Sequence, residues 1–230
     1  MRSFVTRMRE RAPIRYRAVI NQKGEMETMI QEKTYKGPLG SFSYSTADFA
    51  VETKYTPLGP LQILRYRGKE TDGLKIQIPM GLLDASYMFE NKSLVTPPVI
   101  PVTVQRADYM FLNCVSLVKG AVFPYGMKSA SFAYSGCRSL VEAPGLPSTM
   151  KNASFLFDGC RLLVKPPILN KGLENTTGMF RNCFRLESFA DLPESVVKSA
   201  HMYRGCRALA DVLGDAYESA DINAFEPVSE

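Results

Sequence analysis

Cysteine is the residue of this chain with the widest chemical repertoire, and its five cysteines are evenly spaced. They follow one another at intervals of 23 residues: Cys114, Cys137, Cys160, Cys183 and Cys206. Zinc needs ligands that converge on one point, and the chain has no C-x-x-C pair. A disulfide needs Cβ atoms about 3.8 Å apart, whereas equivalent residues of stacked repeats lie about 5 Å apart, and an odd number cannot all pair. The spacing predicts a buried column of reduced thiols, with no metal or other cofactor.

The remaining reactive side chains form no catalytic pattern. The single histidine, His201, falls at a position of the repeat where we expect a packed, structural side chain, as it is shared with Tyr109, Phe132, Phe155 and Gly178. Glu70 and Asp72 are close enough in sequence for acid–base work, but two acids in a polar turn are usually solvated. No phosphate-binding GxxxxGK[S/T] loop is present. We expect no enzyme; the alternative is that residues 1–80 form a small catalytic domain carried by the repeat.

Other residues recur with the cysteines. An aromatic residue lies three positions before each one, at Phe111, Tyr134, Phe157, Phe180 and Tyr203, and a leucine lies three positions after it, at Leu117, Leu140, Leu163, Leu186 and Leu209. An earlier copy at 87–94 keeps Phe89 and Leu94 but is one residue shorter and has no cysteine. A unit of this size cannot bury its own apolar residues, so stacked units must shelter one another. An atypical first copy fits a terminal unit. The pattern predicts about six units over residues 84–210.

Each unit carries its own punctuation. Prolines follow the leucine in EAPGLP at 142–147 and KPPILN at 165–170, and they exclude a helix interior there. The stretch 151–160, KNASFLFDGC, has possible caps for a helical turn, and a glycine precedes its cysteine. We expect each unit to be a short strand, a proline bend, a short helical or irregular segment and a tight turn, which gives an α+β repeat.

These phrases resemble the leucine-rich-repeat class, and within it the BspA-like repeats of bacterial surface proteins. The resemblance is carried by FAYSGCRSLVEAPGLP at 132–147 and FLFDGCRLLVKPPILN at 155–170. It implies a solenoid of about six short coils that serves as a binding or adhesion surface, on bacteria and on some phage particles. A protein or glycan partner is expected. The alternatives are a bacterial cell-surface adhesin-like protein and a purely structural subunit.

The two ends of the chain differ in charge. Residues 1–17 hold six arginines against Glu10, and the last twenty residues hold six acids and no lysine or arginine. Solvated ends are one reading; docking onto partners of opposite charge, including neighbouring copies, is the other. Nucleic acid is a weaker option, because no binding motif supports it. We expect a basic arm with a small β-rich domain or cap at 1–80, the repeats at 81–210, and an acidic tail or cap at 211–230.

Five arginines of the repeats are candidate partner-binding residues. Arg138, Arg161 and Arg207 directly follow cysteines, whereas Arg181 and Arg204 lie two positions before them. Stacking would gather these side chains on one face, where they could attract acidic glycans, carboxylates or an acidic protein surface. The plain alternative is that exposed positions tolerate arginine, whose stem covers apolar surface.

Location is inferred from the same sequence. No apolar run reaches the roughly 18 to 20 residues of a membrane helix, so no membrane insertion is expected. The N-terminus has no apolar stretch typical of a secretory signal. We therefore expect synthesis in the cytoplasm and a virion component, such as a decoration, tail or adhesion protein, rather than a conventionally secreted adhesin.

Overall fold

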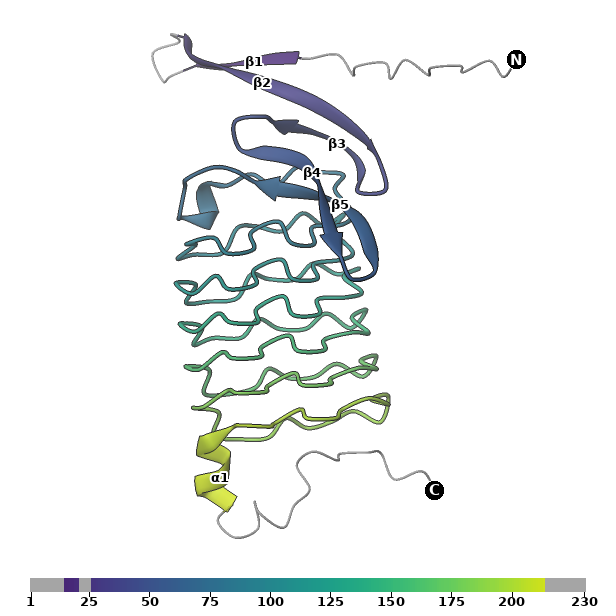
Figure 1. Ribbon diagram of the computed structural model, residues 1–230, viewed down its shortest axis with the longest axis vertical. Helices are drawn as coiled ribbons and strands as arrows, with labels where there is room; N and C mark the ends of the chain where they lie inside the picture. The colour runs from purple at the N-terminus through teal and green to yellow at the C-terminus, as the bar shows by residue number, and fades with distance from the viewer. Residues whose placement is uncertain (1–14, 21–25, 214–230) are drawn as a thin grey trace, which may run out of the picture.

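Two small sheets precede the repeats in the computed structural model, which describes residues 15–20 and 26–213. Three antiparallel strands form the first sheet: β1 (Arg15–Ile20), β2 (Met26–Gly37) and β3 (Gly40–Ser45). A hairpin of β4 (Phe49–Thr56) and β5 (Gly59–Tyr66) forms the second. In Figure 1 both lie at one end of a stack of coils, and the hairpin runs down beside the first of them. The 3-10 helix η1 (Gly73–Lys75), capped by Asp72, lies between this hairpin and the repeats.

The repeats lie parallel on one another. Isolated parallel bridges join Arg106 to Ser129, Ser129 to Asn152, Asn152 to Asn175 and Asn175 to Lys198, so that each link spans 23 residues. A second row after the leucines is sparser, with a bridge from Lys119 to Glu142. The repeat fold is therefore confirmed, but the short strands expected after each leucine shrink to single bridges. Within the described residues, helix is confined to η1 and to α1 (Arg207–Leu213).

The segment before each cysteine, expected to be either helical or irregular, is irregular and consists of a run of tight turns. The amides of Phe155 and Phe157 donate to the next repeat, at the carbonyls of Thr177 and Met179, over 2.8 and 2.9 Å. The intervening amide of Leu156 donates within its own turn, to the carbonyl of Ala153. Every second amide is therefore used for stacking. This alternation needs left-handed backbone at two positions per repeat, such as Phe155 (φ 54°) and Gly159 (φ 73°).

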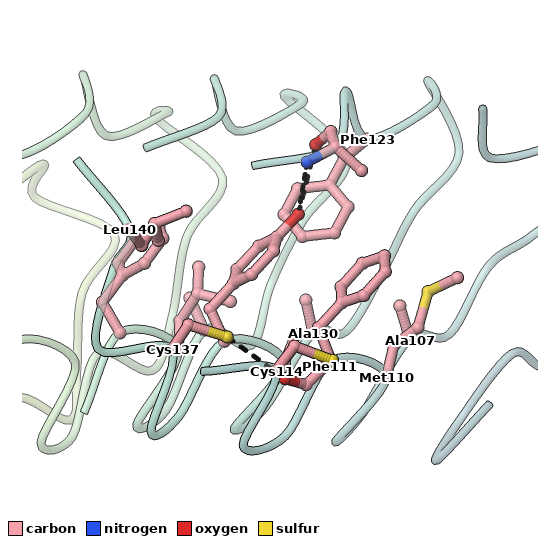
Figure 2. Close-up of a cluster of buried hydrophobic side chains, with 14 of the residues drawn as sticks. Ala107, Met110, Phe111, Cys114, Phe123, Ala130, Cys137 and Leu140 are labelled. Atoms are coloured by element: carbon pink, nitrogen blue, oxygen red, sulfur yellow. Dashed lines mark hydrogen bonds between the residues drawn. The ribbon is translucent and has the colours of Figure 1, made fainter. Parts of the chain in front are cut away.

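The predicted thiol column is confirmed. All five cysteines are free and fully buried. Each thiol donates to the carbonyl of the aromatic residue in the preceding repeat; Cys137 Sγ lies 3.1 Å from the Phe111 oxygen (Figure 2). Beside the thiols, six rings of the same repeat position stack at 5.2–5.8 Å between centroids, and we call them the inner aromatic column: Phe89, Phe111, Tyr134, Phe157, Phe180 and Tyr203.

The N-terminal sheets extend this core. The Tyr66 ring of β5 lies 5.3 Å from Phe89, the first ring of the inner aromatic column, and 5.5 Å from Phe49 of β4. Left-handed residues at Tyr87 and Asn91 place Lys92 where later repeats have cysteine. The first repeat is thus covered by the β4–β5 hairpin instead of by another repeat, which explains why its sequence departs from the pattern.

Candidate functional site

A second set of rings runs along the outside of the repeats. In the first four repeats, the left-handed position five residues before the cysteine, or before Lys92, carries Tyr87, Tyr109, Phe132 and Phe155; in the next two repeats it is held by Gly178 and His201. These half-buried rings, the outer aromatic column, stack at 4.5–4.8 Å with interplanar angles of 5–10°. Such close stacking turns the ring faces toward one another and leaves the ring edges toward the surface.

Cations cover both ends of the outer aromatic column. Lys54 Nζ lies 4.3 Å from the centroid of the Tyr87 ring, and the guanidinium carbon of Arg181 lies 4.9 Å from that of Phe155. Cation–π attraction favours this arrangement. The end faces are therefore occupied as well, so a ligand would meet ring edges and tyrosine hydroxyls.

The β4–β5 hairpin is fixed beside this column by an ion cluster. Glu90 of the first repeat accepts hydrogen bonds from Lys54 Nζ at 2.5 Å and Arg65 Nη2 at 2.9 Å. Burial alone would raise the pKa of Glu90, but these two hydrogen bonds and charges outweigh it and lower the pKa below its usual value. The hairpin tip then projects over the repeats, and its Leu58 side chain is fully exposed.

A groove of about 490 Å³ separates the hairpin tip from the outer aromatic column. One wall is formed by residues 56–61 and includes Pro57, Leu58 and Pro60. The opposite wall is formed by ring edges, and the floor by a row of polar side chains from four successive repeats: Ser86, Asp108, Ser131 and Ser154. The site is thus mixed in character, apolar on one wall and hydrogen-bonding on its floor.

The floor is satisfied except at one atom. Asp108 accepts from Arg106 Nη2 at 2.9 Å and from the Ser131 amide at 2.8 Å, and the hydroxyls of Ser131 and Ser154 lie 2.9 Å apart. Ser86 is 3% exposed, and its Oγ has no hydrogen-bond partner among the described residues. Buried polar atoms are normally paired, but this oxygen lies beneath the groove surface, so a ligand would meet the Tyr87 and Tyr109 hydroxyls instead.

The two tyrosines of the groove are neutral donors at physiological pH. Burial, followed by the neighbouring Tyr109 and acidic groups, raises the pKa of Tyr87 to about 12. Burial also raises the pKa of Tyr109. Both phenols therefore keep their protons, and the groove offers hydroxyl hydrogen bonds instead of phenolate charge.

The structure brings three of the five predicted arginines into one row. The guanidinium carbons of Arg161 and Arg207 lie 5.2 and 4.6 Å from the Phe184 ring, which occupies the position between them in the repeat. Arg138 holds the same position one repeat earlier and is exposed. We call Arg138, Arg161 and Arg207, with Phe184, the basic edge. Its gathering agrees with the sequence-based expectation; a partner for it stays a prediction.

The other two arginines differ from that expectation. Arg181 makes a two-point contact with Asp158, from Nε at 3.0 Å and Nη2 at 2.7 Å, and covers Phe155. It thus belongs to the outer aromatic column and is not a free cation for a partner. Arg204, the equivalent residue one repeat later, is exposed. His201 is also exposed rather than packed, since the preceding repeat offers Gly178 and no ring at its position.

The acids considered for catalysis have structural partners. Glu70 Oε1 accepts from the amides of Thr71 and Asp72, each at 2.9 Å. Asp72 accepts from Thr96 Oγ1 and from the Leu74 amide that it caps. The hydrogen bond from Thr96 is the main cause that lowers the pKa of Asp72. In the described ranges, no group of three or more His, Cys, Asp or Glu side chains could hold a metal ion.

The groove was missed by sequence reasoning. The recurrence of Tyr109, Phe132 and Phe155 at one repeat position was visible, but it indicated packing. Nothing in the sequence tells that the segment 56–61 would fold back over that position, because the contact joins elements far apart in the chain.

Stacked tight turns, an inner column of rings and a thiol in every full repeat define a leucine-rich-repeat fold. A solved structure supports this directly: the chain is similar to a leucine-rich-repeat protein of T. pallidum, with 24% identity and a TM-score of 0.51 over 74% of this chain and 92% of that one. The resemblance to leucine-rich-repeat proteins is thereby confirmed at the level of the fold.

A second similar structure is a leucine-rich-repeat protein of Bacteroides ovatus, with 18% identity and a TM-score of 0.48 over 72% of this chain and 45% of that one. No protein-family model matches the sequence, and no curated protein matches it. Across the described residues, the structure has no helix long and apolar enough to cross a membrane.

Proposed function

We propose that this protein is a non-catalytic recognition protein that binds an extended segment of a partner protein in the groove beneath the hairpin tip. The observation that carries the proposal is the groove itself, in which an exposed apolar tip faces ring edges and the hydroxyls of Tyr87 and Tyr109. The stacked repeats support a solenoid of about six coils as the rigid scaffold. Rigid walls favour binding, because little conformational freedom is lost there.

The chemistry of the walls favours a peptide over a glycan. Sugars are commonly held by stacking their C–H faces on an open aromatic face, and here ring faces cover one another or lie beneath Lys54 and Arg181. The opposite wall has Pro57 and Pro60, which lack amide donors. Ring edges and Leu58 suit an aliphatic side chain. The Tyr87 and Tyr109 hydroxyls suit a peptide carbonyl or amide.

The length of the groove suits four or five residues. Its floor spans four repeats, from Ser86 to Ser154. With a spacing of about 4.8 Å between stacked chains, this is roughly 15 Å, and an extended peptide covers about 3.3 Å per residue. Alternate side chains of such a segment would face the apolar wall.

The experiment is a selection of displayed random peptides on the full chain, followed by measurement of the dissociation constants of the selected peptides. We expect sequences with aliphatic side chains and at least tenfold weaker binding to Leu58→Asp. The matched control is Val122→Asp, at another strongly exposed apolar residue that lies outside the groove (83% exposed, against 100% for Leu58); this variant should bind like wild type. If the selected peptides bind Leu58→Asp as tightly as wild type, the groove is not their binding site. Glycans that depend on Leu58 would show that the partner class is wrong.

For the location we propose a virion component, such as a decoration, tail or adhesion protein, and the alternative is a bacterial cell-surface adhesin-like protein. The support is the repeat phrase shared with the BspA-like class. Mass spectrometry of purified phage particles and of washed cell envelopes decides between them. Detection on envelopes alone would contradict the virion.

A further inference from the structure

The basic edge holds cations that the described part of the protein leaves uncompensated. Arg65, Arg67, Arg106 and Arg181 each lie within ion-pair distance of a carboxylate. Arg138, Arg161 and Arg207 have no such carboxylate among the side chains that the structure describes. The guanidiniums of Arg161 and Arg207 flank the Phe184 ring, and this contact fixes the positions of both positive charges. A preformed row of this kind attracts carboxylates.

A complementary segment is attached to the same end of the molecule. Residues 214–230 contain five acids and no lysine or arginine, and they directly follow α1, whose first residue is Arg207. Seventeen residues can extend about 56 Å. The row from Arg138 to Arg207 spans three repeat steps, which is roughly 15 Å. The segment is therefore long enough to reach every arginine of the basic edge from its point of attachment.

We propose that the acidic segment 214–230 binds the basic edge of its own chain, and that it thereby competes with acidic partners for this surface. Charge complementarity provides the attraction, and the tether provides an effective concentration of the order of millimolar. A free acidic protein or glycan must then displace the segment. This inference is independent of the groove beneath the hairpin, and neither proposal fails if the other one does.

The test compares the full chain with a variant in which the five acids are neutralised, Asp215→Asn/Glu218→Gln/Asp221→Asn/Glu226→Gln/Glu230→Gln. The probe is a fluorescein-labelled decaglutamate, and the readout is its dissociation constant from anisotropy. At 50 mM salt, the neutralised variant should bind the probe at least fivefold tighter than wild type. At 500 mM salt the difference should fall below twofold, because exposed charges are screened. Adding Arg138→Glu/Arg161→Glu to the neutralised variant should abolish the gain.

A second measurement reports the contact without any probe. The native thiols are buried, so a nitroxide reagent should attach selectively to Ser229→Cys in the native protein. Amide NMR signals of residues around Arg138 and Arg161 should broaden at 50 mM salt and recover at 500 mM. Equal probe binding by wild type and the neutralised variant, together with unbroadened signals, would overturn the proposal. A salt-sensitive dimer of wild type that the neutralised variant loses would also overturn it, by assigning the segment to a second copy.

Discussion

At the scale of single residues, cysteine is suited to its column because it is small and carries a weak donor. Each thiol donates to the carbonyl of the ring residue one repeat earlier, as Cys160 does to Tyr134 over 3.2 Å. Burial raises the pKa of Cys114 and Cys206 to about 12 and raises those of the three inner thiols well above their usual value. These thiols are therefore unreactive in the native state.

The raised pKa values predict a loss of stability in alkali. Below about pH 8.5 the thiols are protonated in both states. Above it, the unfolded chain releases protons that the native state keeps, so the free energy of unfolding falls as pH rises toward about 12. Each thiol can contribute up to about 1.4 kcal/mol per pH unit. Urea titrations in reducing buffer between pH 7.5 and 10.5 measure this slope. A free energy of unfolding that is flat over this range would contradict the buried column.

A single thiol can be separated from the rest. Cys137→Ala removes a donor and leaves a small cavity, so we expect the free energy of unfolding to fall by about 1–3 kcal/mol. The alkaline decrease of the free energy of unfolding with pH should also lose the contribution of one thiol proton. Arg138→Ala, next in the chain and exposed, should change stability by less than about 0.5 kcal/mol. Urea unfolding of both variants provides the comparison. An equal effect of the two substitutions would show that Cys137 does not reside in the core.

At the scale of the element, the tight turns depend on residues that tolerate left-handed backbone. Gly136 (φ 75°) and Gly159 (φ 73°) occupy the same place in successive repeats but differ in surroundings. A Cβ at Gly136 would lie 2.2 Å from Asn113 Oδ1, whereas at Gly159 the nearest atom is 3.7 Å away. The side-chain amide of Asn113 also donates from Nδ2 to Asn91 Oδ1 over 3.1 Å.

This difference makes a matched pair of substitutions. Gly159→Ala should cost about 1–2 kcal/mol, the strain of a left-handed residue with a side chain. Gly136→Ala should cost more, because Asn113 must also move and give up its hydrogen bond. Chemical denaturation of the two variants measures the order. A larger loss for Gly159→Ala would mean that the Asn113 contact contributes nothing.

The elements were only partly predictable. The 23-residue period gives the stacking, the buried thiols and the row of Arg138 and Arg161, because each of these repeats locally. The tight turns could not be distinguished from a short helix. The amides of KNASFLFDGC can donate within a helix or to the next repeat, and the presence of that repeat determines which occurs. The groove depends on the contact of residues 56–61 with the repeats, which no period encodes. Asp158 and Arg181 hold the same position in successive repeats, so the period could have predicted their pairing.

At the scale of the whole molecule, Glu90 joins the N-terminal hairpin to the repeats. Its carboxylate serves Lys54 and Arg65 at once, and Lys54 also covers the Tyr87 ring. The same contacts set the height of the hairpin tip above the groove. Loss of this carboxylate should therefore affect both the stability of the hairpin and the binding of a peptide.

Acid should separate the hairpin from the repeats. The pKa of Glu90 is lower in the folded state, so its stabilisation is present above the unfolded value of about 4.3 and is lost as pH falls through the folded value. The protection factors of β4 and β5 amides, which take the slower intrinsic exchange in acid into account, should fall below about pH 4. Glu90→Gln should show fast exchange already at pH 7, whereas Glu142→Gln, at an exposed pair with Lys119, should not. Unchanged exchange in Glu90→Gln would show that the ion cluster of Glu90 with Lys54 and Arg65 does not hold the hairpin against the repeats.

The hydrogen bonds between repeats run in both directions along the stack. In the turns before the cysteines, amides donate to the following repeat, as Phe155 does to Thr177, whereas the amide of Lys151 donates to Lys128 of the preceding repeat. The Tyr66 amide of β5 donates to the Met88 carbonyl, where the first repeat has no predecessor. Each interior repeat therefore offers the same donors and acceptors to both of its neighbours, and the interior units are interchangeable. Evolution could lengthen or shorten such a protein by whole multiples of 23 residues without redesigning either terminus, whereas an insertion of any other length would throw donors and acceptors out of step.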